Sequence, residues 1–187
     1  MGRASVVTTI DQPGLVDRCA EGDDSAFEEM FALYSRDVYR VARRMTGSHD
    51  DADDVMQETF VRAFQHIGGI DSDASIRKWL LTIAINNCID RRRRRRVPVV
   101  ALAEDPPSPS SGPESEVVVR EFNEKLTEAI GRLSGRQRAC FVLHEMEGLK
   151  VTEIAEHLKC SPGAVKSYLH RARETLRKDL TPYLAAS

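Results

Sequence analysis

The 187-residue chain has few aromatic residues and lacks any long apolar run. Aromatics make up 6% of the sequence, with a single tryptophan, whereas 30% of the residues are charged. This composition suits small helical domains and disfavours a large β-sandwich. The best candidate for an apolar run, Trp79 to Ile85, is far shorter than the roughly 18 residues that a membrane span needs. Residues 1–13 contain one arginine and no apolar stretch of the kind found in secretion signals. We therefore expect a cytoplasmic protein without a membrane span.

The four cysteines form no CxxC pair, so reduced and mostly buried thiols are the default expectation. One alternative is a tetrahedral zinc site, because Cys140 and His144 are four residues apart and His157 and Cys160 are three apart. Such spacings also arise within amphipathic helices without a metal. We predict no metal and no cofactor, and keep the zinc site as the weaker alternative.

A Pro- and Ser-rich stretch divides the chain. Five of the eight prolines lie between Pro98 and Pro113, where no apolar periodicity is present. This composition is typical of a flexible linker. No stretch indicates a strand, so the sequence predicts an all-α fold of two small helical domains joined by a flexible linker. The predicted parts are a flexible extension at 1–13, a first domain at 14–96, the linker at 97–116 and a second domain at 117–187.

Three helices are predicted in the first domain from apolar residues at helical spacing. The first starts at a capping pattern of Ser25 and Glu28 and stops at Gly47. Its apolar face consists of Phe27, Met30, Phe31, Tyr34, Val38, Val41 and Met45. The second starts at Ser48, and its apolar face consists of Ala52, Val55, Met56, Phe60, Ala63, Phe64 and Ile67. The third starts near Ile76 and has two adjoining apolar faces, so we expect it to be the most buried.

The second domain ends in a predicted helix-turn-helix. A capping box of Ser134 and Gln137 precedes one helix, and Ser161 followed by Pro162 marks the start of the last one. Between 164 and 178 the last helix has five basic residues and one acidic residue. An ordinary solvated helix is the alternative, but the preceding turn and the excess of positive charge favour contact with DNA. The outward residues of this helix include Lys166, Ser167, His170, Arg171 and Arg173.

Six consecutive arginines, Arg91 to Arg96, end the third predicted helix. Such a run is either a disordered segment or a phosphate-binding patch. Here it follows Asn86, Asn87 and Asp90, whose side chains can address bases, and it lies at a helix end that favours cations. A helix with polar groups at its middle and arginines at its end suits docking on nucleic acid.

An acidic block precedes these elements and consists of Asp50, Asp51, Asp53, Asp54 and Glu58. Clustered carboxylates can bind magnesium, but successive helical residues point about 100° apart and cannot all converge on one ion. Because a negative face repels DNA, docking on a basic protein surface is favoured over a solvated face and over a metal site.

At this point the residues resemble a known family. The segments 53–64 (DDVMQETFVRAF) and 79–86 (WLLTIAIN), with the arginines after them, resemble the promoter-melting domain of bacterial sigma factors. The segments 148–158 (GLKVTEIAEHL) and 161–173 (SPGAVKSYLHRAR) resemble their domain that binds the minus-thirty-five element. Two such domains and little else are typical of the extracytoplasmic-function (ECF) group.

The resemblance implies a non-enzymatic role and particular partners: core RNA polymerase through its β′ coiled coil and β flap, promoter DNA, and an anti-sigma factor. Residues implied to bind polymerase are Asp53, Asp54, Gln57 and Glu58. Those implied at the minus-ten element are Ser75, Ile76, Trp79, Asn86, Asp90, Arg91, Arg93 and Arg94, with loop 71–76 matching the loop that captures a flipped base. Those implied at the minus-thirty-five element are His144, Ser161, Lys166, Ser167, His170, Arg171 and Arg173. The linker matches a segment that is directed toward the polymerase active-site channel.

Three positions depart from the family pattern. The family usually has an aromatic residue at Ile76 and an arginine at Ile85, and relatives often have arginine at His144.

Two other classes of function stay open on the residues alone. One is a helix-turn-helix regulator that binds DNA without polymerase, and the other is a magnesium-dependent nuclease.

Overall fold

The computed structural model describes residues 14–70, 75–95 and 125–184, and these residues form helices and short connections with no strand among them. The predicted extension at 1–13 and the predicted linker at 97–116 lie outside the described residues. The elements in chain order are α1 (Leu15–Ala20), α2 (Asp24–Thr46), α3 (His49–His66), the 3₁₀ helix η1 (Ile67–Gly69), α4 (Ile76–Arg95), a helical stretch at 125–132, α6 (Gly135–Phe141), the π-helix η2 (Val142–Met146), α7 (Val151–His157) and α8 (Pro162–Leu184). The prediction of an all-α fold is confirmed. None of the described helices combines the length and the apolar character that crossing a membrane requires.

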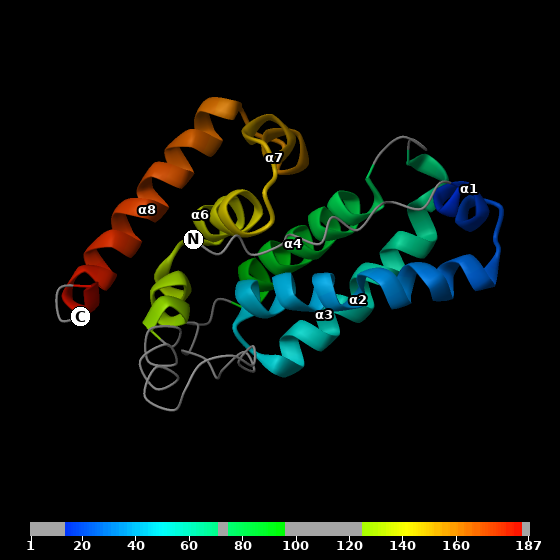
Figure 1. Cartoon of the computed structure of the whole chain (residues 1–187), viewed down its shortest axis with the longest axis horizontal. Coiled ribbons are helices and arrows are strands. Elements are labelled where there is room, and N and C mark those ends of the chain that lie inside the picture. The colour runs from blue at the N-terminus through cyan, green and yellow to red at the C-terminus, as the bar shows by residue number, and fades with distance from the viewer. Residues whose placement is uncertain (1–13, 71–74, 96–124, 185–187) are drawn as a thin grey trace, which may run out of the picture.

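Helix α4 packs against both α2 and α3 (Figure 1). Its buried apolar residues are Ile76, Leu80, Leu81, Ala84, Ile85 and Cys88. Burial on two adjoining faces is what the sequence pattern predicts for this helix.

The short helix α1 was not predicted, because six residues are too few to show a helical period. It buries Leu15, Val16 and Cys19 against α2 and η1.

The helix ends show which of the predicted capping residues are confirmed. Gly47 ends α2 with φ 80°, a left-handed conformation that suits glycine, and Ser48 caps α3 by accepting a hydrogen bond from the Asp51 amide. The predicted start of α2 at Ser25 is wrong. Asp23 is the N-cap instead, and its carboxylate accepts the Ser25 amide at 2.9 Å. Aspartate caps a helix as well as serine does, and Asp23 stands two residues earlier.

The capping box at the start of α6 is confirmed. The Ser134 amide donates to Oε1 of Gln137 at 3.0 Å, and the Gln137 amide donates to the Ser134 hydroxyl at 3.4 Å. Replacing Ser134 with alanine should therefore lower the free energy of unfolding by about 1 kcal/mol, as measured by urea denaturation. Ser167→Ala, at an exposed position in the second turn of α8, is the matched control and should leave the unfolding midpoint unchanged or slightly raised, because alanine favours the helix. Equal midpoints for the two variants would contradict a stabilising cap at Ser134.

The C-terminal helices form a second packing unit around α8. The segment from 125 to 133 packs on α8 through Ala129, Ile130, Leu133, Ala172, Leu176 and Leu180, and Phe141 of α6 packs against this cluster. Helix α7 packs on the first half of α8, where Ile154, Ala155, Val165 and Leu169 are buried. The π-helix η2 between α6 and α7 was not predicted, because one wider turn leaves no distinct trace in an apolar pattern.

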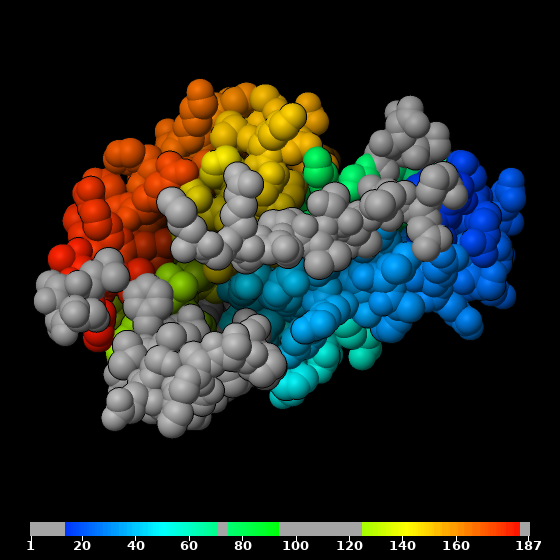
Figure 2. Space-filling view, viewed as in Figure 1, coloured from blue at the N-terminus to red at the C-terminus, as the bar shows by residue number. Residues whose placement is uncertain are grey.

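The N-terminal and C-terminal helices lie directly against each other. Residues of α6, η2, α7 and the start of α8 belong to the same buried apolar cluster as residues of α1 to α4. In the space-filling view the C-terminal part, yellow to red, lies against the blue to green N-terminal part (Figure 2). The described residues therefore form one closed body, which the sequence does not predict.

Candidate functional site

The helix-turn-helix predicted near the C-terminus has the expected geometry. Helix α7 ends at His157, a tight turn follows, and Lys159 takes the left-handed conformation with φ 49°. The Ser161 hydroxyl accepts the Ala164 amide at 3.1 Å and so caps α8. Ala155 is buried where the two helices cross, and a larger side chain there would separate them.

The outward face of α8 has the side chains that the sequence places there. The exposed residues on it include Ser161, Lys166, Ser167, His170, Arg171 and Arg173. Arg173 donates from Nε to Glu145 at 3.0 Å, and His170 lies 3.6 Å from Glu174. Lys166 and Arg171 make no ion pair among the described residues, so their charges face solvent. Such free cations beside a serine are suited to phosphates and base edges in a major groove.

His144, which the resemblance assigns to DNA contact, has a local structural contact. It lies in η2, and its Nδ1 is 2.8 Å from the carbonyl oxygen of Leu149. That hydrogen bond links the π-helix to the turn after Gly148, whose φ is 74°. The ring holds the turn before α7, and its contact with DNA stays a prediction.

The N-terminal end of α4 presents less side-chain surface than the sequence suggests. Ile76 is 1% exposed and faces the core, so it offers no surface to an unstacked base in this arrangement. Trp79 is half-buried and packs on the same core. The Ser75 hydroxyl accepts the Lys78 amide at 3.5 Å at the start of the helix. Residues 71–74, the rest of the predicted capture loop, lie outside the described residues.

Farther along α4, Asn86 is half-buried and Asp90 is exposed, as residues that address DNA would be. Asn87 is only 2% exposed: its Nδ2 donates to the Thr59 hydroxyl at 3.3 Å, while its Oδ1 has no partner. The idea that Asn87 addresses bases is therefore wrong for this arrangement. A buried amide with one unsatisfied oxygen costs stability.

The arginine run is used in different ways along its length. Arg91 pairs with Asp54 on α3 and lies 3.7 Å from Asp51, whereas Arg92 donates to the Leu133 carbonyl at 3.2 Å. Arg93 is exposed, and the side chain of Arg94 falls outside the described part of the structure. The first two arginines thus have partners within the protein, and contact of this run with phosphates stays a prediction.

The acidic side chains of α3 lie at the surface, and several of them form ion pairs with neighbouring basic residues. Glu58 accepts from Arg62 at 2.7 Å, and Asp53 lies 2.9 Å from His49. Asp54 remains 56% exposed despite its contact with Arg91, and Gln57 is exposed as well. The carboxylates point to solvent along one side of the helix and do not converge. This geometry favours a protein surface over a metal site.

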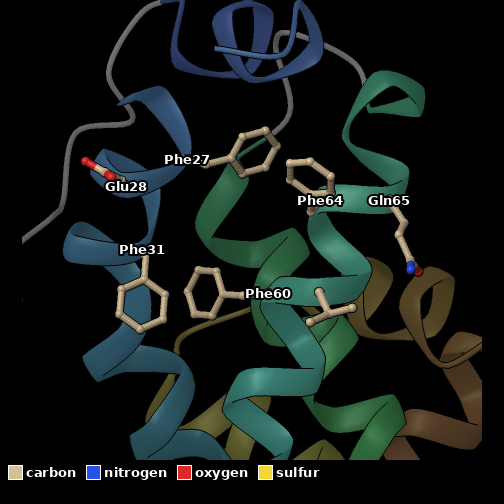
Figure 3. Close-up of a pocket in the computed structure, with 7 residues that line it drawn as sticks. Phe27, Glu28, Phe31, Phe60, Phe64 and Gln65 are labelled. Carbon is tan, nitrogen blue, oxygen red and sulfur yellow. The ribbon is translucent and has the colours of Figure 1, made fainter. Parts of the chain in front are cut away.

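An aromatic groove lies between α2 and α3 and continues the exposed face of α3 toward its C-terminal end. We use this name for the surface lined by Phe27, Phe31, Phe60, Val61 and Phe64 (Figure 3). The ring centroids of Phe27 and Phe64 are 4.6 Å apart, and those of Phe31 and Phe60 are 4.8 Å apart. Phe31, Val61 and Phe64 are 45%, 57% and 56% exposed.

The apolar pattern does not predict the aromatic groove, and the prediction that Phe31 and Phe64 face the core is wrong. The apolar stripes of α2 and α3 are wider than the core that they meet, so their outer edges remain in solvent. The adjacent pair Met30 and Phe31 is a weak signal, because neighbouring helical residues point about 100° apart and one of them can lie at the edge of the buried face. Exposed aromatic clusters of this kind mark binding surfaces.

The zinc alternative fails on geometry. The described residues contain no group of three or more His, Cys, Asp or Glu side chains placed to hold a metal ion. Cys140 and Cys88 are buried, and burial raises the pKa of each thiol to about 12.

Comparisons with known proteins match both the N-terminal and the C-terminal helices to one family. Residues 30–97 match Sigma-70 region 2, and residues 123–176 match Sigma-70 region 4. ECF RNA polymerase sigma factor SigW of Bacillus subtilis is 33% identical over 171 residues, which cover 86% of this chain and 91% of that protein. SigM of Mycobacterium tuberculosis, also an ECF sigma factor, is 32% identical over 158 residues, which cover 84% of this chain and 78% of that protein.

Solved structures share the fold. The structure of CnrH in complex with the cytosolic domain of CnrY has a TM-score of 0.67 and 26% identity, and the match covers 92% of this chain and 99% of CnrH. Sigma factor RpoE in complex with the anti-sigma factor NepR, from Bartonella quintana, has a TM-score of 0.68 at 24% identity, and the match covers 83% of this chain and 96% of RpoE. Both region matches and the full-length relatives lead to one conclusion: the chain belongs to the ECF RNA polymerase sigma factors, which are non-enzymatic transcription initiation factors.

Proposed function

We propose that this chain binds core RNA polymerase, directs it to promoters through their minus-ten and minus-thirty-five elements, and promotes melting of the DNA. The observation that carries the proposal is the combination, in one chain and in this order, of a region 2 match and a region 4 match, each with its own exposed polar or basic helix face. Its place of action is the cytoplasm, where polymerase and promoters are found. The two domains proposed are 14–96 and 117–187, with the segment 97–116 as their tether.

Polymerase docking is assigned to the exposed face of α3. Asp53, Asp54, Gln57 and Glu58 give this face a negative polar part, and the aromatic groove gives it an apolar part. A partner helix with an apolar stripe bordered by basic residues fits both parts at once. We assign this place to the β′ coiled coil of the polymerase, and we assign the β flap to the C-terminal domain.

Promoter contacts are assigned to α4 and α8. On α4, Asn86 and Asp90 face the minus-ten element, Arg93 and Arg94 hold phosphates, and Trp79 with Ser75 borders the place of an unstacked base. Unstacking a base costs a few kcal/mol, which contacts at such a place can offset. On α8 the contacts to the minus-thirty-five element come from Ser161, Lys166, Ser167, His170, Arg171 and Arg173.

An anti-sigma factor is the proposed regulator. CnrH and RpoE, which share this fold, were both solved bound to a partner, and the partner of RpoE is an anti-sigma factor. The aromatic groove exposes three large apolar side chains, Phe31, Val61 and Phe64, so a helix of such a regulator would compete there with polymerase.

The test is run-off transcription with core polymerase, this chain and genomic DNA, followed by mapping of transcript starts. We expect discrete start sites that share two upstream sequence elements, against a control with core polymerase alone. Failure to produce any defined start would overturn the proposal. Footprints that appear without polymerase and do not change on its addition would instead identify an independent DNA-binding regulator.

A further inference from the structure

The cations on the outward face of α8 fall into two groups. Lys166 and Arg171 make no ion pair among the described residues. Arg173, in contrast, donates from both Nε and Nη2 to a single oxygen, Oε1 of Glu145, with the Nε contact at 3.0 Å. Glu145 belongs to η2 and not to α8, and its side chain is 35% exposed while that of Arg173 is 56% exposed. One cation of this face is therefore bound to a carboxylate from a neighbouring element.

The backbone on both sides of Glu145 is held in place. The Glu147 amide donates to the carbonyl of Val142 at 3.0 Å, which closes the wide turn of η2. The Leu149 amide donates to the carbonyl of Leu143 at 2.9 Å. Val142 and Leu143 are themselves buried. The position of the Glu145 carboxylate is thus set by packing, as is required of a group that positions another side chain.

The contact with Glu145 occupies the edge of Arg173 that nucleic acids use. Arginine binds phosphates and guanine through two N–H donors along one edge of the guanidinium. Nε and Nη2 form such an edge, and both donate to Glu145. A phosphate that approaches this edge must displace the carboxylate, which also repels it. Glu145 therefore competes with DNA for Arg173.

The sizes of the two competing interactions are similar. An exposed ion pair changes an equilibrium constant by about 1.5- to 5-fold. One phosphate contact on B-DNA changes the log–log salt slope by about 0.9, which is about eightfold in affinity at 0.1 M salt relative to 1 M. A loosely placed phosphate therefore does not fully displace Glu145, whereas a phosphate fixed by other contacts of the helix does. Base contacts of α8 can supply that fixation only at the right sequence.

We propose that Glu145 is a specificity-determining residue of the DNA-binding face. It keeps Arg173 paired when α8 lies on DNA of arbitrary sequence, and it releases Arg173 at a minus-thirty-five element, where base contacts fix a phosphate against the guanidinium. The inference rests on the proposed function, because it requires α8 to contact promoter DNA. A carboxylate beside a basic face then weakens binding to wrong sequences more than binding to the right one, which is discrimination by a repulsive group.

The test measures binding of the full chain with core polymerase to two duplexes over a range of salt. One is a promoter defined by the run-off experiment, and the other is the same duplex with the minus-thirty-five element replaced. With Glu145→Gln, affinity for the replaced duplex should rise up to about eightfold at 0.1 M salt, and its log–log slope should become steeper by up to about 1. Affinity for the intact promoter should rise at most about fivefold with an unchanged slope, because Arg173 already contacts phosphate there.

Two controls separate this pair from the general effect of removing a negative charge. Glu128→Gln makes the same change at an exposed carboxylate that pairs with Arg132, away from the outward face, and should leave both slopes unchanged. Glu145→Gln in an Arg173→Gln chain should also leave both slopes unchanged, because no guanidinium remains to be released.

An equal slope change with and without Arg173 would assign the effect to the overall field and overturn the proposal. An unchanged slope on the replaced duplex, or a lower affinity for both duplexes, would overturn it as well. These outcomes all require a complex that binds the intact promoter. A complex that binds no promoter at all would instead remove the proposed function.

Discussion

Core polymerase is expected to lose at least about 100-fold in affinity for a chain carrying both Val61→Asp and Phe64→Asp, since central apolar contacts each contribute about 2 kcal/mol or more to an interface. Both side chains are more than half exposed in the aromatic groove, so the changes should leave the folded structure intact. Each aspartate places a charge where an apolar stripe of the β′ coiled coil would lie, and that charge would lose its hydration without a cation to replace it. The measurement is competition with a labelled unmodified chain for a limiting amount of core polymerase.

Tyr183→Asp is the control for this prediction. Tyr183 is 44% exposed near the end of α8, well outside the aromatic groove, and its replacement introduces the same carboxylate into an exposed aromatic position. It should bind polymerase like the unmodified chain. Full affinity of the groove variant would remove the aromatic groove from the docking surface, and far-UV circular dichroism of each variant shows that loss of affinity is not loss of helix.

The helices that could be predicted are those whose signals are local. Ser48, Ser134 and Ser161 begin helices as their neighbours in the sequence indicate, and Gly47 ends one. Helix α4 could be predicted as the most buried of the three because two adjoining faces are apolar between Ile76 and Ile89. Helix α1 and the π-helix η2 could not be predicted, since the first is too short for a period and the second changes the period by one residue in a single turn.

In the candidate site, too, the residues whose position follows from the local helical period could be predicted, and those placed by contacts between distant helices could not. The outward face of α8 follows directly from the helical period, so Lys166 and Arg171 lie where the sequence places them. The aromatic groove could not be predicted, because it depends on how two helices meet. The same holds for the ion pairs that Glu147, after η2, makes with arginines of α2 and α4. Asn87 shows the reverse error: a polar residue next to Asn86 is turned by about 100° into the core, and only its contact with Thr59 makes that burial tolerable.

Promoter binding by the polymerase complex should fall at least about 100-fold when Lys166 and Arg171 are both replaced by glutamate, because each contact of this kind contributes about 1–3 kcal/mol. Both side chains are exposed on the outward face of α8, and neither has an ion-pair partner among the described residues, so the reversal should not disturb the fold. The loss should appear at promoters that contain a minus-thirty-five element, measured as filter-retained complex at fixed salt. With alanine at both positions, the log–log slope of affinity against salt should become shallower by up to about 2, one for each lost phosphate contact.

The control reverses the same number of charges two turns farther along α8, with Arg177→Glu and Lys178→Glu. Both residues are exposed, so the change in net charge and in long-range potential matches that of the first variant. If α8 reads DNA with its N-terminal half inside the major groove, the control should lose much less affinity than the first variant, because its charges lie near the edge of the contact. Equal losses in the two variants would mean that the helix attracts DNA by its overall field and makes no groove contact at Lys166 and Arg171. That outcome would leave the fold and the polymerase docking untouched while removing the minus-thirty-five contact from the proposed function.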